Sequence, residues 1–421
     1  MSGFSVSTAT ETLPISETHS PASDEQVSEI VRDCHASETA VYPIGGGTSL
    51  GYGLAAKRDG VGLSTSGLDK VIDYPARDMT ITVGAGVTMQ AIAETLAAEK
   101  QRLPLDVPAA DQATIGGVVA TNSNGPRRYG QGTVRDHVIG IQAVDGRGLL
   151  FKGGGRVVKN VAGYDFCKLL TGSLGTLGVM TQLTLKLKPQ PEQLAFALCA
   201  PADLDEAEKL LAALIDSQTT PCAIELLRGT VWNDDPAIAQ MSAASGLCLA
   251  IAFEGTATEV EWMTKQLVDE WSDLGIASSQ VVLDEAASEL MSRLAEFSAA
   301  GESPLVLQAN IVPSGTTRFV SALRELDENC SVQAHAGNGV VIARLSEFPP
   351  DGLAKTLIGQ LHPVAAAAHG HVTVLSNPSS AEMTHQSAWG AIDAPVDLMT
   401  AVKREFDPKS ILNPERFIYL R

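Results

Sequence analysis

Basic residues are scarce in this sequence. Its 421 residues include 30 Lys and Arg against 49 Asp and Glu, a formal net charge of −19 at pH 7 with a sequence pI near 4.8. Proteins that bind nucleic acid need basic surface to neutralise the phosphates. This charge balance therefore argues against a nucleic-acid partner.

Long apolar runs and a basic, apolar start are also missing. Residues 1–20 are polar and contain no Lys or Arg. The longest apolar segments, such as Leu247–Phe253, are far shorter than the roughly 20 residues that cross a bilayer. We expect a cytoplasmic protein without direct membrane insertion, any membrane association being made through partner subunits.

Paired cysteines are absent as well. The six cysteines are scattered, and no two of them form a CxxC pair. In a chain of this size the pattern is typical of reduced, buried thiols and not of a disulfide framework or an iron–sulfur cluster.

What the sequence does have is an uneven distribution of glycine and charge. Of its 38 glycines, 25 lie between positions 41 and 180. Residues 1–192 carry 17 Lys/Arg against 19 Asp/Glu, whereas residues 193–421 carry 13 against 30. An alternating segment near residue 180 ends at two prolines, which indicates a domain boundary there. We expect four regions: a polar tail over 1–21, a glycine-rich domain over 22–192, a second domain over 193–390 and a C-terminal segment over 391–421.

The acidic second half alternates predicted strands and helices. Its apolar periodicity predicts the order strand, helix, strand, strand, helix, strand twice, starting at Leu194–Ala200 and again at Leu305–Ile311. This order indicates one antiparallel sheet covered by helices, an α+β domain. A last helix is predicted over Val396–Phe406.

Three glycine-rich segments stand out in the first half: Gly45–Ser49, Thr114–Gly125 and Gly172–Val179. In the first, consecutive N–H groups without Cβ obstruction can wrap a diphosphate. In the second, small residues allow a bulky ligand to approach closely. Neither G-x-G-x-x-G nor G-x-x-x-x-G-K-[ST] is present, so a nicotinamide fingerprint and a Walker loop are not supported. Taken alone, each segment is also compatible with an ordinary loop, tight helix packing or a helix C-cap.

A basic stretch lies between the second and third segments. Positions 127 to 159 contain seven Lys and Arg but only two acidic residues, Asp136 and Asp145. A positive stretch in an acidic protein suits an anionic cofactor or substrate. A solvated surface ribbon is the alternative.

Together these motifs resemble a known family. Pro43–Leu50, Asp106–Asn122 and the segment from 159 to 179 are similar to the FAD-binding domain of the vanillyl-alcohol oxidase type. Phe406–Pro414 is similar to the closing motif of FAD-linked 2-hydroxy-acid dehydrogenases. The form of the segment from 159 to 178 most resembles the FAD-binding subunits of bacterial glycolate oxidases. The resemblance implies an α+β protein: a two-subdomain FAD-binding domain, an α+β cap with an antiparallel sheet, and a C-terminal segment that returns to the flavin.

The resemblance also implies which residues bind FAD. Those expected to hold the pyrophosphate are Gly45, Gly46, Gly47, Thr48 and Ser49. Those expected along the ADP and isoalloxazine path are Pro108, Thr114, Gly116, Gly117, Ala120, Asn122 and Gly125. Val179 is expected to contact the adenine end through its backbone, and Asn413 to approach the flavin. Residues 41–60 contain no His or Cys for covalent attachment, so we expect noncovalent FAD.

This sequence keeps only part of the catalytic motif that such enzymes carry. Relatives that oxidise 2-hydroxy acids carry a segment resembling G-H-x-G-D-G-N-x-H, and the nearest match, Ala334–Val340, keeps His335 but lacks the Asp and the second His. His335 is the candidate base, with Tyr164 and Arg128 as candidate substrate contacts. We predict no metal site, although His369 and His371 are spaced to share one face of a strand.

Three functions remain open at this point. The first is the FAD-binding subunit of a glycolate oxidase complex, which oxidises glycolate or a similar 2-hydroxy acid beside a catalytic flavoprotein subunit and an iron–sulfur subunit. The second is a self-sufficient FAD-linked dehydrogenase of another small hydroxy acid or alcohol. The third is a scaffold that keeps the fold without flavin. Flavin absorbance and its response to glycolate distinguish the three.

Overall fold

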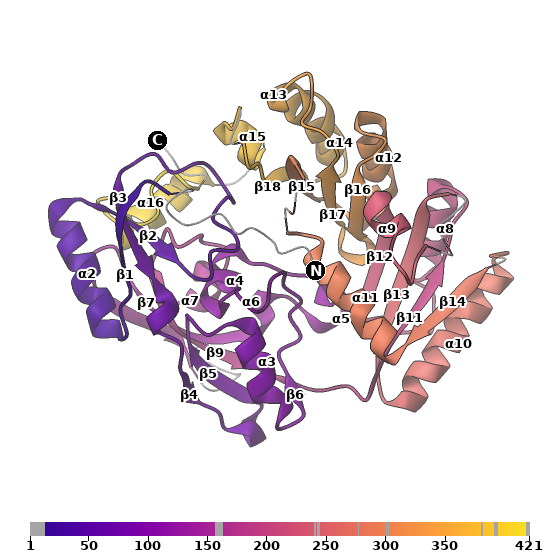
Figure 1. Cartoon of the computed structure of the whole chain (residues 1–421), viewed down its shortest axis with the longest axis horizontal. Coiled ribbons are helices and arrows are strands. Elements are labelled where there is room, and N and C mark those ends of the chain that lie inside the picture. Colours follow the sequence, from indigo (N-terminus) through magenta and orange to yellow (C-terminus); the bar gives the residue numbers. More distant parts are fainter. Residues whose placement is uncertain are drawn as a thin grey trace. The chain divides into compact units, whose positions relative to one another are not determined.

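The computed structural model describes residues 13–155, 163–239, 241, 245–276, 278–299, 301, 303–379, 382–390 and 395–417. The chain divides into two compact units (Figure 1). The described residues of the first unit fall within Met1–Asn124, Gly132–Gln190 and Ile392–Arg421. Those of the second fall within Gly125–Gln131 and Pro191–Ala391.

The first unit opens with a small parallel sheet. Its strands lie in the order β1 (Ile15–His19), β3 (Gly60–Ser64) and β2 (Ala40–Ile44). Helix α2 (Asp24–Ser37) begins at the N-cap Ser23 and buries its apolar stripe. Strand β1 falls inside the segment that we expected to be a polar tail. The tail interpretation missed it because an edge strand with polar side chains looks like loop sequence.

A second, antiparallel sheet forms the core of the first unit. Its five strands lie in the order β4 (Val71–Asp73), β5 (Thr80–Gly84), β9 (Val179–Lys186), β7 (Val138–Val144) and β8 (Leu150–Gly154). The remaining elements of this unit are α3 (Met89–Ala97), β6 (Gln101–Arg102), α4 (Ile115–Thr121), α6 (Val134–His137), α7 (Phe166–Leu170), β10 (Lys188–Pro189) and α16 (Val396–Phe406).

The second unit is built on one eight-stranded antiparallel sheet. The strand order is β14 (Ser279–Leu283), β11 (Gln193–Cys199), β13 (Leu247–Gly255), β12 (Ala223–Arg228), β16 (Ser331–His335), β17 (Val340–Leu345), β15 (Leu305–Asn310) and β18 (His371–Ser376). The helices are α5 (Arg128–Gln131), α8 (Leu204–Ala213), α9 (Thr230–Asn233), α10 (Ala257–Asp273), α11 (Asp284–Glu296), α12 (Thr316–Leu326), α13 (Leu353–Thr356), α14 (His362–Ala367) and α15 (His385–Trp389).

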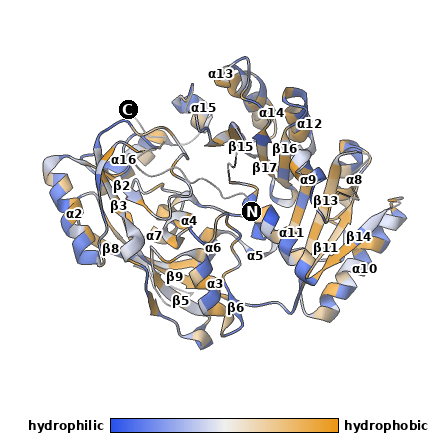
Figure 2. Ribbon diagram, in the orientation of Figure 1, coloured by the Kyte–Doolittle hydropathy of each residue, from blue (hydrophilic) through white to orange (hydrophobic). Residues whose placement is uncertain are grey.

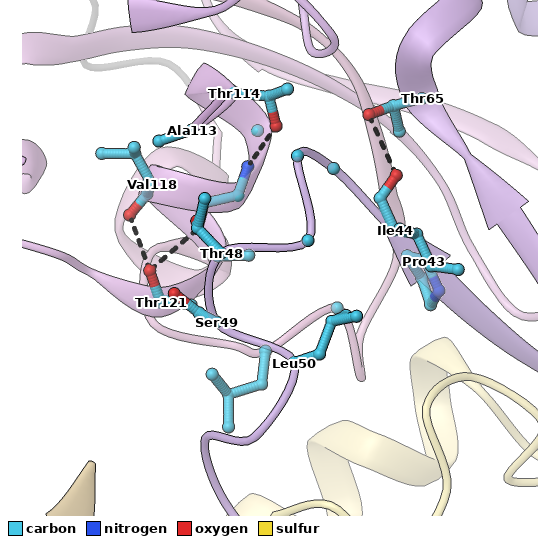
Figure 3. Close-up of a pocket in the computed structure, with 18 of the residues that line it drawn as sticks. Pro43, Ile44, Thr48, Ser49, Leu50, Thr65, Ala113, Thr114, Val118 and Thr121 are labelled. Atoms are coloured by element: carbon cyan, nitrogen blue, oxygen red, sulfur yellow. Dashed lines mark hydrogen bonds between the residues drawn. The ribbon is translucent and has the colours of Figure 1, made fainter. Parts of the chain in front are cut away.

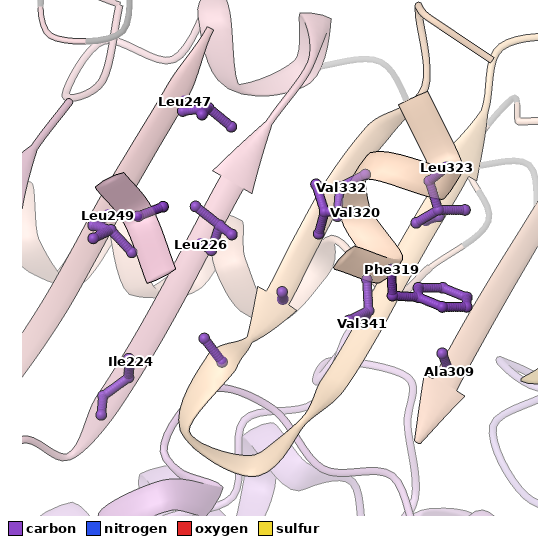
Figure 4. Packing of buried hydrophobic residues seen from close by; sticks show 14 of the residues in the cluster. Ile224, Leu226, Leu247, Leu249, Ala309, Phe319, Val320, Leu323, Val332 and Val341 are labelled. Atoms are coloured by element: carbon purple, nitrogen blue, oxygen red, sulfur yellow. The ribbon is translucent and has the colours of Figure 1, made fainter. Parts of the chain in front are cut away.

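The repeated strand–helix order predicted from the sequence is present in this sheet. β11 to β14 form one half and β15 to β18 the other, and the halves join where β12 pairs with β16. The strands are largely hydrophobic in Figure 2, and a buried cluster on one face packs α8, α10 and α12 against the sheet. Figure 4 shows the part of this cluster that includes Phe319, Val320 and Leu323 of α12. Burying each large side chain of such a cluster contributes about 1.5–3 kcal/mol.

Three features of the second unit differ from the sequence-based expectation. Helix α11 was not predicted, although its buried side chains cover the other face of the sheet. The second helix of the repeat that starts at Leu305–Ile311 is divided, because Leu357–Leu361 adopts a π-helical turn. The short segment Gly125–Gln131 belongs to this unit: the Gly130 N–H donates to the carbonyl of Cys222 at 3.0 Å.

A search of the described residues found no helix both long and apolar enough to cross a membrane.

Candidate functional site

The first glycine segment follows directly from β2. Gly46 lies so close to the backbone that an added Cβ would be 1.8 Å from the carbonyl oxygen of Gln112. Gly47 has φ +77°, a conformation that glycine adopts without strain. Among the described residues, the backbone N–H groups of Gly46–Ser49 donate to no partner. The loop therefore offers a row of free donors, which is the chemistry that binds a phosphate group.

The second segment forms α4 and packs against this loop. The Thr114 hydroxyl accepts a hydrogen bond from the Gly117 N–H at 3.4 Å and caps the helix. Gly116 donates to the Ala85 carbonyl at 2.9 Å, and an added Cβ there would meet the same oxygen at 2.9 Å. In Figure 3 the loop with Thr48 and Ser49 runs beside the helix that carries Thr114 and Thr121. The glycines thus allow the two backbones to approach closely.

The third segment closes the far end of α4. Asn122 ends the helix in a left-handed conformation, with φ 53°. The N–H of Gly172 donates to the Val119 carbonyl, and the N–H of Leu174 donates to the Ala120 carbonyl, both at 2.9 Å. These bonds satisfy carbonyls that a helix end leaves free. The three glycine segments therefore meet around one short helix.

The C-terminal segment returns to the same place. Val41 donates to the Ile411 carbonyl and Asn413 donates to the Val41 carbonyl, both at 2.8 Å, so the segment adds to the edge of β2. The Asn413 side-chain amide donates to the Leu174 carbonyl at 2.6 Å. Asn413 thereby joins the end of the chain to the third glycine segment.

A buried ion pair holds this returning segment. Lys403 Nζ donates to Asp407 Oδ2 at 2.6 Å, to the Thr176 carbonyl at 2.7 Å and to the Leu412 carbonyl at 3.1 Å. Asp407 in turn accepts the N–H groups of Ile411 and Leu412. Burial lowers the pKa of Lys403, and the charge of Asp407 opposes that shift.

Replacing Lys403 with Met is expected to destabilise the protein by about 3–5 kcal/mol, because Asp407 would remain as a buried charge without its partner. Urea denaturation of the apoprotein measures this loss of unfolding free energy. Arg404→Met on the exposed face of the same helix is the matched control and should change stability by less than about 0.5 kcal/mol. Equal losses in the two variants would contradict the role of Lys403.

The segments enclose a cavity of about 1010 Å³, a figure that includes open solvent at its mouth. Most of the predicted FAD residues line it: Gly45, Gly46, Gly47, Thr48, Ser49, Pro108, Thr114, Gly116, Gly117, Ala120, Val179 and Asn413. Asn122 and Gly125 are not among its lining residues. Arg416 lines it too, and the sequence analysis missed this residue because it lies beyond the motif we compared.

The lining chemistry fits FAD. Free backbone N–H groups suit a diphosphate, and apolar or small side chains such as Val107, Val118 and Met180 suit planar rings. The absence of Cβ atoms in the glycine loop lets a ligand reach the backbone.

A separate polar cluster lies inside the second unit. Glu225 on β12 and His335 on β16 are directly opposite in the sheet, and both are buried. His335 Nδ1 lies 2.8 Å from Glu225 Oε1, and Gln333 donates to Glu225 Oε2 at 2.9 Å. His335 Nε2 has no hydrogen-bond partner in the described part of the chain. The carboxylate therefore holds the proton on Nδ1 and leaves the lone pair of Nε2 free.

Arg128 belongs to the same cluster. Burial lowers the pKa of its guanidinium, and the charge of Glu225 opposes this shift. Its Nε has no partner among the described atoms. Tyr129 follows it, and an added Cβ at Gly337 would be 2.5 Å from the Tyr129 ring. The segment that carries Arg128 thus packs against Gly337, two residues after His335. Glu225 is a polar group that the sequence analysis did not identify.

The other candidate residues are not among the partners of this cluster. Tyr164 is in the first unit and is 84% exposed. Part of its motif, residues 156–162, lies outside the described residues. His369 and His371 are both exposed at the start of β18. Within the described residues, no group of three or more His, Cys, Asp or Glu is arranged to hold a metal ion.

The fold and cavity of the first unit define a flavin-binding protein. Comparison with known families agrees: the FAD binding domain matches residues 18–154, and the C-terminal domain of FAD linked oxidases matches residues 190–373 and 390–417. The chain belongs to the FAD-linked oxidase family. FAD is its cofactor, and the chain is an FAD-dependent oxidoreductase, which confirms the prediction from the motifs.

Curated relatives share most of the chain. The glycolate oxidase subunit GlcD of Bacillus subtilis is 25% identical over 94% of this chain and 87% of its own length. The mitochondrial D-lactate dehydrogenase [cytochrome] of Arabidopsis thaliana is 28% identical over 94% of this chain and 72% of its own length. A D-2-hydroxyglutarate dehydrogenase of Xanthomonas citri is 37% identical, over 46% of this chain and 41% of its own length.

Solved structures show the same fold. p-Cresol methylhydroxylase with substrate bound matches with a TM-score of 0.71 and 19% identity, covering 96% of this chain and 90% of its own. Alkyldihydroxyacetonephosphate synthase matches with a TM-score of 0.66 and 17% identity, covering 95% and 77%. These likenesses confirm the predicted fold class, a vanillyl-alcohol oxidase type FAD-binding domain with an α+β cap.

Proposed function

We propose that this chain takes part in the FAD-dependent oxidation of a small 2-hydroxy acid, such as glycolate, to the 2-oxo acid. The observation that carries the proposal is the buried Glu225–His335 pair, whose Nε2 has no partner among the described residues; the charge of Glu225 also acts on the guanidinium of Arg128. The names of the relatives, which include a glycolate oxidase subunit and D-lactate dehydrogenases, support this substrate class.

Each residue of the cluster has a defined task in this reaction. Noncovalent FAD, which the cavity around Gly45–Ser49 would hold, would supply the acceptor for the hydride of the substrate α-carbon. His335 Nε2 accepts the proton of the substrate hydroxyl, and Glu225 keeps the ring in the tautomer that leaves Nε2 basic. The guanidinium of Arg128 binds the substrate carboxylate. Removal of one proton and one hydride turns the hydroxy acid into the oxo acid. Tyr164 stays a candidate substrate contact.

We further propose that the chain, besides reducing its own flavin, works in a complex with a second catalytic flavoprotein subunit and with an iron–sulfur subunit that carries the electrons onward. Two observations support this. The segment Ala334–Val340 lacks the Asp and second His of the resembling motif. The six cysteines are buried and free, so they offer no cluster to carry electrons onward.

Anaerobic mixing of the FAD-loaded chain with glycolate or D-lactate tests the function. We expect at least one of the two to bleach the visible flavin absorbance, and acetate, which has no hydroxyl group to oxidise, to leave it unchanged. A chain whose flavin is reduced by dithionite but by neither hydroxy acid would contradict oxidation by this chain. Bleaching followed by sustained turnover without any added protein would contradict the need for partner subunits.

A further inference from the structure

Arg416 carries the one charged side chain among the described residues that line the FAD cavity. It lies in the C-terminal segment just after Asn413 and is only 5% exposed. The remaining lining residues are glycines, apolar residues and neutral polar residues. Whatever charge the cofactor presents to this cavity therefore meets a single side-chain cation.

Two hydrogen bonds hold the Arg416 guanidinium beside the end of the first glycine segment. Its Nη2 donates to the carbonyl of Leu50 and, at 2.8 Å, to the carbonyl of Tyr52. Both residues lie within three positions of the end of Gly45–Ser49. The N–H groups of that segment, from Gly46 onward, have no partner in the described structure. The cation is therefore hydrogen-bonded to the turn that directly continues the segment with the free donors.

No carboxylate among the described residues forms an ion pair with this buried charge. Arg416 takes part in none of the ion pairs found among the described residues, in contrast to buried Lys403, which pairs with Asp407. Burial lowers the pKa of Arg416 to about 10, and the only opposing influence is Tyr42. A buried cation without a counter-charge is costly, and an anion that binds beside it removes part of that cost.

We propose that Arg416 binds the diphosphate of FAD and supplies its counter-charge, while the N–H groups of the glycine loop supply neutral donors. A guanidinium suits this task, because its planar array of N–H groups can bond two phosphate oxygens at once. The proposal concerns cofactor binding alone and holds whichever substrate the enzyme oxidises.

Binding of three ligands to the apoprotein tests this inference by calorimetry. FAD and ADP contain the diphosphate, whereas riboflavin contains the flavin ring and no phosphate. We expect Arg416→Gln to weaken FAD and ADP binding about 10- to 100-fold, the loss of one hydrogen-bonded charge, and to leave riboflavin binding unchanged. Arg404→Gln removes the same charge from an exposed position in the same unit and should change none of the three affinities.

A variant that keeps the charge separates this role from simple support of the loop. Arg416→Lys should retain most of the FAD affinity if the charge matters, and it remains informative if Arg416→Gln does not fold. Equal weakening by Lys and Gln would overturn the proposal and leave Arg416 as a loop support. Equal weakening of riboflavin and FAD would overturn it by placing the guanidinium at the ring. Unchanged FAD affinity in Arg416→Gln would overturn it outright.

Discussion

Replacing Gly46 with Ala is expected to abolish FAD binding. The added methyl group would lie 1.8 Å from the Gln112 carbonyl oxygen and 2.6 Å from its carbon. Both atoms belong to the backbone that leads into α4, so the clash cannot be relieved by turning a flexible side chain. The glycine loop would have to move away from α4, and its free N–H groups would no longer converge on the diphosphate.

Gly51 provides the matched control for this prediction. It lies two residues beyond the same segment, and an added Cβ there meets nothing within 4 Å. Gly51→Ala should therefore keep a full complement of FAD. The flavin released on denaturation, divided by the protein concentration, gives the occupancy of each variant. Thermal unfolding of the two apoproteins shows whether Gly46→Ala has lost only the cofactor or the fold as well. Full occupancy in Gly46→Ala would show that the loop is not held against Gln112.

Replacing His335 with Gln is expected to slow flavin reduction by the hydroxy acid about 10²- to 10⁴-fold. Glutamine still donates a hydrogen bond toward Glu225 but has no basic nitrogen, so the substrate hydroxyl loses its proton acceptor. Rapid anaerobic mixing measures the rate of bleaching, and the dependence of that rate on substrate concentration measures binding. Because His335 acts on the proton, the limiting rate should fall while the apparent substrate affinity and the FAD content stay the same.

Glu225→Gln tests the contribution of the carboxylate charge beside His335 in the same experiment. Its amide oxygen still accepts the hydrogen bond from His335 Nδ1, but the negative charge that faces the ring when Nε2 takes the substrate proton is lost, so we expect a smaller loss of about 10- to 100-fold. His19→Gln, a histidine replacement at the surface of the first unit, is the control and should leave the rate unchanged. Rates equal to the wild type in His335→Gln would remove this histidine from the mechanism and leave the buried pair as a packing feature.

Short stretches of sequence were enough to predict the cofactor. The glycine segments Gly45–Ser49 and Gly172–Val179 depend on local backbone conformation, because glycine alone tolerates positive φ and close backbone approach. The capping residues Ser23, Thr88 and Thr114 act equally locally in the structure, since each bonds to an N–H within its own first helical turn. The repeated strand and helix order of the second unit followed from hydrophobic periodicity, which is also a local property.

Other features depended on segments that are far apart in the chain. Glu225 and His335 are 110 residues apart, and they face each other because the register of β12 against β16 pairs them directly. A shift of one residue in that register would turn one of the two side chains to the opposite face of the sheet. No motif around Ala223–Arg228 marks Glu225, so the partner of the histidine was invisible in the sequence.

The sequence by itself thus determined the flavin and the fold class, because these depend on composition and on neighbouring residues. Only the tertiary structure decided which polar groups meet. Glu225 meets His335, Lys403 meets Asp407 and the carbonyl of Thr176, and Arg416 meets the end of the glycine loop. The same holds for Gly125–Gln131, which lies between first-unit residues in sequence and packs with the second unit. The physical reason is that long-range pairings arise from strand register and from the return of the C-terminus, neither of which a local pattern encodes.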